Sequence, residues 1–63
     1  MAHRPITRKV DVLVRYPGSS GLFTLGQYET QANNRDTRWA IDLDLRNQKI
    51  HVTAIVLRKP NRI

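Results

Sequence analysis

One histidine and two aspartates are spaced so that they could do acid–base chemistry. Asp42 and Asp44 alternate with apolar residues. If residues 39–57 form a hairpin, His51 lies across from Asp44, as an oriented general base would. Paired carboxylates also bind hard cations. A solvated strand face with one cross-strand ion pair explains these residues equally well. The sequence therefore predicts no catalytic residue, although a small ribonuclease can be imagined from His51, Arg46 and Lys49.

The remaining chemical motifs are absent from the sequence. The chain has no cysteine, and its two histidines are too few for a convincing metal site. The Gly/Ser run at 18–21 lacks the lysine and the following helix of a phosphate-binding loop. No nucleophile elbow, zinc spacing or dinucleotide fingerprint is present. We expect a non-enzymatic protein without a cofactor or a bound metal.

Charge gives the strongest functional signal. The chain has 63 residues and a net charge of +6. Residues 1–9 carry three cations and no acid, residues 58–63 carry three more, and the charges of residues 10–57 cancel. The excess therefore lies in the two ends, which are predicted to be basic arms at 1–8 and 58–63 around a domain at 9–57.

Eight of the basic residues are predicted to bind the partner. Guanidinium groups make forked contacts to phosphate or carboxylate. The first expectation is a nucleic-acid-binding module that holds phosphates with little base readout. The alternative is a small interaction protein or inhibitor that docks on an acidic protein surface. The predicted site comprises Arg4, Arg8, Lys9, Arg35, Arg38, Arg58, Lys59 and Arg62.

Residues 39–57 dominate the predicted fold. Trp39, Ile41, Leu43 and Leu45 alternate with polar residues or alanine, and the alternation resumes at Ile50. A period of two is typical of a strand with one buried face. A turn at 47–48 would place every apolar residue of both strands on the same side.

Two further strands are predicted at 9–16 and 22–31, joined by the Pro/Gly/Ser turn at 17–21. A four-residue loop would pair Tyr16 with Phe23. Tyr28 falls out of phase with Phe23, and a bulge at Gly26 would return it to the core face. The aromatic residues, Trp39 included, are expected to fill the core, with Tyr28 the best candidate for an exposed one.

These elements predict a mostly β fold: a four-strand antiparallel meander, either flat or curled into an open barrel. The meander would bring Lys9 and Arg58 to the same end of the sheet and merge the two arms into one positive site. The alternative is an α+β fold with one short helix near 34–45, capped by Asn34 or Asp36.

Chain length and hydropathy give expectations about self-association and about where the protein acts. A chain this short buries only roughly 60% of its extended surface, so a partner or self-association would add stability. The apolar residues Ile55 and Leu57 favour a homo-oligomer. No apolar run is long enough to span a membrane, and residues 1–15 lack the apolar stretch of a signal peptide. A cytoplasmic protein without membrane contact is therefore expected.

Overall fold

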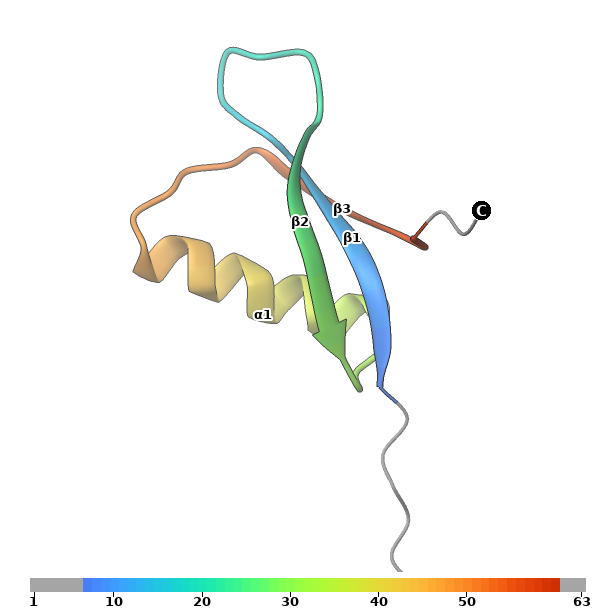
Figure 1. Ribbon diagram of the computed structural model, residues 1–63. Coiled ribbons are helices and arrows are strands. Elements are labelled where there is room, and N and C mark those ends of the chain that lie inside the picture. Colours follow the sequence, from blue (N-terminus) through green and yellow to red (C-terminus); the bar gives the residue numbers. More distant parts are fainter. Residues whose placement is uncertain (1–6, 61–63) are drawn as a thin grey trace, which may run out of the picture.

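The protein folds as one antiparallel sheet with one helix on one of its faces (Figure 1). The structure is a computed structural model, and it describes residues 7–60. The elements in chain order are β1 (Arg8–Arg15), β2 (Phe23–Thr30), α1 (Asn34–Asn47) and β3 (Ala54–Arg58). The strand order is β2-β1-β3, so the first strand is the central one.

The β1–β2 hairpin confirms the predicted pair of strands and its bulge. Val12 pairs with Gly26 and Leu13 with Thr24, which leaves Leu25 without a partner. Gly26 has φ +137°, a conformation that residues with a side chain rarely adopt. Beyond the bulge Tyr28 pairs with Val10 and shares its face, as expected.

The predicted hairpin register is wrong, because the connecting loop is longer than four residues. Phe23 pairs with Val14 instead of with Tyr16. Tyr16 lies beyond the end of β1 and still packs on Phe23, with ring centroids 5.4 Å apart.

Local signals at both ends define α1. The side chain of Asn33 accepts a hydrogen bond from the Asp36 backbone N–H at 2.8 Å, which caps the first turn. At the other end Lys49 has φ +61°. The N–H of Lys49 donates to the Arg46 carbonyl at 3.0 Å, and that of Ile50 donates to the Leu45 carbonyl at 2.9 Å. These two bonds form a Schellman motif.

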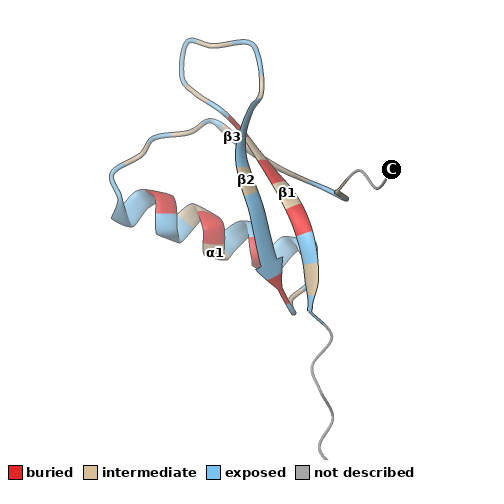
Figure 2. Ribbon diagram, in the orientation of Figure 1, coloured by how far each residue is buried: buried red, intermediate tan, exposed pale blue. Residues whose placement is uncertain are grey.

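The core lies between α1 and the helix-facing side of β1 (Figure 2). Alternate residues of β1 and residues four apart on α1 supply its buried apolar side chains, and Ile55 and Leu57 of β3 pack beside them. β2 is exposed along nearly its whole length. The buried apolar residues are Val10, Val12, Val14, Ile41 and Leu45.

The four-strand meander and the barrel variant are wrong. Residues 34–47 form a helix, so the protein is α+β with an open three-strand sheet. Asn47 and Gln48, the expected hairpin turn, instead end α1. The helix near 34–45, weighed as the alternative, corresponds to α1, although its N-cap is Asn33.

The last strand also differs from its predicted phase. Ile55 pairs with Val14 and Leu57 with Val12, so these two face the helix. Ala54 and Val56, which were expected in the core, lie on the opposite, uncovered face. The predicted alternation from Ile50 is therefore displaced by one residue within β3.

Candidate functional site

The start of β1 and the end of β3 lie at the same end of the sheet. The two strands are antiparallel neighbours, and Arg58 pairs with Asp11. Lys9 and Lys59 line one hollow of about 820 Å³, together with Thr7, Arg8, Gln27, Glu29 and Pro60. The placement of Lys9 and Arg58 at the same end, which was expected of a meander, thus occurs in a different topology, because β1 is central and pairs directly with the last strand.

Arg8, predicted to bind the partner, holds the fold together. Its guanidinium donates to the Ala32 carbonyl at 2.8 Å and to the Asn34 side-chain oxygen at 2.7 Å. These bonds fix the chain where it enters α1. The cations that remain at this end among the described residues are Lys9, Arg58 and Lys59, while Arg4 and Arg62 lie outside the described residues.

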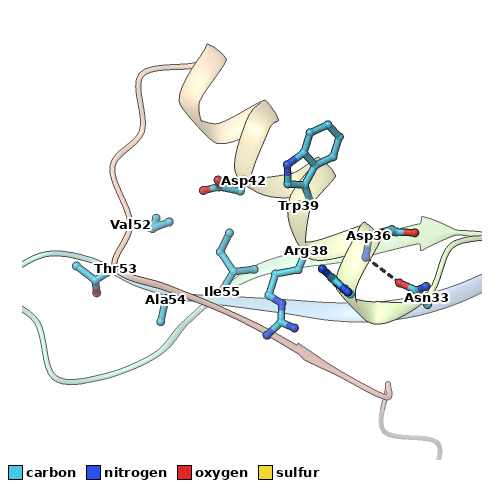
Figure 3. Close-up of a pocket in the computed structure, with 10 residues that line it drawn as sticks. Asn33, Asp36, Arg38, Trp39, Asp42, Val52, Thr53, Ala54 and Ile55 are labelled. Atoms are coloured by element: carbon cyan, nitrogen blue, oxygen red, sulfur yellow. Dashed lines mark hydrogen bonds between the residues drawn. The ribbon is translucent and has the colours of Figure 1, made fainter.

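A second region, the α1–β3 groove, separates the first half of the helix from the edge strand. It has a volume of about 800 Å³, and Val52, Thr53, Ala54 and Ile55 line its sheet side. Trp39, two arginines and two aspartates line its helix side together with the cap residue Asn33: Arg35, Arg38, Asp36 and Asp42. In Figure 3 the Arg38 side chain extends toward β3, while the Trp39 ring points away from it.

The prediction that Trp39 fills the core is wrong. It is 66% exposed, the largest exposed fraction among the exposed large hydrophobic residues of the described chain, and Leu43 is 39% exposed. The buried residues of α1 are Thr37, Ile41 and Leu45, four apart. Trp39 lies two positions from this series, about 200° around a helix with 3.6 residues per turn. Trp39 and Leu43 therefore form an apolar outer stripe on the far side of α1.

Only one of the three arginines beside the outer stripe forms an ion pair. Arg46 pairs with Asp42 at 3.2 Å, one turn apart on the helix. This is the only ion pair within residues 7–60, so Arg35 and Arg38 have no acidic partner there. The predicted site is thus divided: Lys9 and Arg58 occupy the uncovered sheet face, and Arg35 and Arg38 lie on the helix.

The structure separates the residues that could have done acid–base chemistry. Asp44 lies on α1 and accepts a hydrogen bond from the Gln48 side chain at 3.0 Å. His51 is exposed in the loop between α1 and β3. The predicted pairing of the two across a hairpin is therefore wrong. Within residues 7–60 no three histidine, aspartate or glutamate side chains gather as a metal site would need.

Comparison with protein-family models, with curated protein sequences and with solved structures found no match to this chain. In the part of the chain that the structure describes, no helix is long and apolar enough to cross a membrane.

The exposed arginines on α1 were predicted as site residues. The exposed tryptophan beside them was missed, and its signal was the helix cap at Asn33, which fixes which way each following residue faces.

Proposed function

We propose that the protein is a non-enzymatic nucleic-acid-binding module that contacts phosphates from one end of its sheet. The supporting observation is that Lys9 and Lys59 line the same hollow at one end of the sheet. Residues 1–9 and 58–63 together hold all of the formal charge excess. Because Lys9, Arg58 and Lys59 lie at one end of the sheet, their charges add over one short stretch of a polyanion.

Backbone contacts set the expected binding behaviour. Lysine and arginine neutralise phosphates and release counterions, so affinity falls with salt and depends little on base sequence. Arg8 is already bonded within the fold, which leaves Arg4, Lys9, Arg58, Lys59 and Arg62. If all five met phosphates on duplex DNA, the log–log salt slope would be about −4.5, from roughly −0.9 per contact.

The test is binding of a labelled duplex and a labelled single strand at several salt concentrations, with a matched pair of double variants. Lys9→Glu with Lys59→Glu should weaken binding to every sequence alike and make the salt slope shallower by about two contacts' worth. Arg15→Glu with Lys49→Glu makes the same change in net charge elsewhere, because Arg15 lies at the far end of β1.

The two outcomes discriminate clearly. Local phosphate binding predicts a large loss for the first double variant and a small one for the second. Equal losses would show that only the total charge matters. Absence of binding to either nucleic acid at low salt would exclude the proposed function.

A further inference from the structure

The outer stripe of α1, Trp39 and Leu43, has no role in the core. Both side chains are exposed, whereas Ile41 and Leu45 on the opposite side are each only 6% exposed. A surface helix ordinarily has one apolar stripe, which faces its own core. A second stripe at the same spacing on the far side places a tryptophan in water, with no gain to the fold.

The chemistry around the stripe favours a protein partner. Tryptophan and arginine are enriched in the residues that dominate binding energy at protein interfaces. Arg35 and Arg38 lie beside Trp39 at the α1–β3 groove, and Val52 and Ile55 give the groove apolar surface. A base could stack on Trp39, but the aliphatic side chain of Leu43 beside it offers little to a sugar–phosphate backbone, and Asp36 and Asp42 in the groove would repel phosphates.

The charge of the partner follows from the unmatched cations. Of the two acids that line the groove, Asp42 is paired with Arg46 and Asp36 lies in the first turn of α1, where the helix dipole stabilises a carboxylate. Arg35 and Arg38 have no ion-pair partner within residues 7–60. A ligand that seats an apolar side chain against Trp39 would therefore gain from carboxylates on the groove side, where forked contacts to guanidinium groups form.

A second copy of the chain fits the stripe less well. A two-fold axis that packs α1 antiparallel on α1 keeps each flank of the helix on its own side. The flank with the unpaired Arg35 and Arg38 would then lie on the same side of the interface as the corresponding flank of the other copy. Like charges across an interface oppose association.

We infer that the outer stripe and the adjoining α1–β3 groove form a docking surface for an acidic segment of another protein. An apolar side chain of that segment lies on Trp39 and Leu43, and its carboxylates meet Arg35 and Arg38. This surface is distinct from the Lys9–Lys59 hollow, so the loss of one binding activity leaves the other intact.

The test is selection of displayed random peptides on the full chain, with counter-selection on the Trp39→Ala variant. The selected peptides should be rich in aspartate and glutamate and contain a large apolar residue. Their affinity should fall roughly tenfold or more on Trp39→Ala and on Arg35→Glu with Arg38→Glu. Lys9→Glu with Lys59→Glu, equal in net charge to the arginine pair, should bind the peptides much as the unaltered chain does.

Intrinsic fluorescence gives an independent readout, because Trp39 is the only tryptophan in the chain. A bound peptide that covers the indole should shift its emission to shorter wavelength, and the shift should saturate with the binding curve. A basic peptide of the same apolar pattern should leave the emission unchanged.

Four results would overturn the inference. They are selected peptides without an acidic bias, peptides that bind the Trp39→Ala variant equally well, no peptide that survives counter-selection, and an oligonucleotide that displaces the peptides from Trp39. Sedimentation supplies one more, since self-association that Leu43→Ser abolishes would assign the stripe to a second copy.

Discussion

The two apolar stripes of α1 have the same spacing and opposite surroundings. Ile41 and Leu45 are buried against β1, whereas Trp39 and Leu43 are exposed. The difference arises from the cap at Asn33 and from the position of the sheet, not from the hydrophobicity of the side chains. Burial in this helix is thus decided by phase, and the exposed stripe is available for a function that the buried one is not.

The largest expected effect separates the two stripes directly. Leu45→Ala should lower the free energy of unfolding by about 2–5 kcal/mol, because it leaves a cavity in a small core. Leu43→Ala, the same chemical change on the exposed stripe, should lower it by less than about 1 kcal/mol. Urea unfolding followed by circular dichroism measures both, and equal losses would contradict the phase of the helix.

Thr37 is the first residue of the buried stripe, and its substitution tests whether a polar contact also stabilises that side of α1. Its hydroxyl is buried and lies 2.9 Å from the hydroxyl of Thr30 at the end of β2. Thr37→Val should lower the free energy of unfolding by about 1–3 kcal/mol, since it removes one partner of a buried hydrogen bond. The double variant with Thr30→Val should lose less than the sum of the two single variants; additive losses would show that the contact contributes little.

The cap that sets the phase is the next test. Asn33→Ala should lower the free energy of unfolding by about 0.5–2 kcal/mol, because the Asp36 N–H loses its side-chain acceptor. Asn47→Ala, an exposed change in the last turn, serves as the control and should leave stability nearly unchanged. A null result for Asn33→Ala would mean that packing alone fixes the start of the helix.

A substitution at Lys49 should stabilise the protein, in contrast to the substitutions above. It occupies the left-handed region at φ +61°, where glycine is favoured. Lys49→Gly should raise the free energy of unfolding by about 0.5–1 kcal/mol. Thermal unfolding would detect the gain as a higher midpoint, whereas a lower midpoint would indicate that the lysine side chain contributes contacts at this helix end.

The smallest expected effect on stability is that of Trp39→Ala. The indole is 66% exposed, so its removal should change the free energy of unfolding by no more than about 0.5 kcal/mol. The same variant should bind acidic peptides far more weakly. A large loss of stability here would instead give the outer stripe a role in holding the fold.

The two strands of the β1–β2 hairpin and its bulge could be predicted from the sequence, whereas α1 was predicted only as the alternative to a strand. Alternating valines and a glycine at the bulge specify a strand pair almost independently of what covers it. In α1 the period of two at 39–45 is equally the signature of two stripes, each with residues four apart, on opposite sides of a helix. Only the cap at Asn33 and the Asp42–Arg46 spacing distinguish the two interpretations, and both are weak local signals.

The candidate sites could be predicted only in part, because residue type can be read from the sequence whereas the phase of the helix cannot. The arginines 35 and 38 were predicted from their residue type, which does not depend on local structure. The exposure of Trp39 depends on helical phase, so a strand interpretation placed it in the core. The placement of Lys9 and Arg58 at the same end of the sheet was expected from antiparallel strands and holds here because β1 and β3 are neighbours.

The central position of β1 also has a kinetic consequence. β2 follows β1 closely in sequence, so the hairpin needs only a short loop to close. Thr53, just before β3, bonds to Arg15 across 38 positions, and closing so long a stretch carries a larger entropic penalty. We expect β3 to dock last during folding. The α1–β3 groove would then exist only in completely folded chains, and a ligand bound there would slow unfolding by holding the last-formed strand in place.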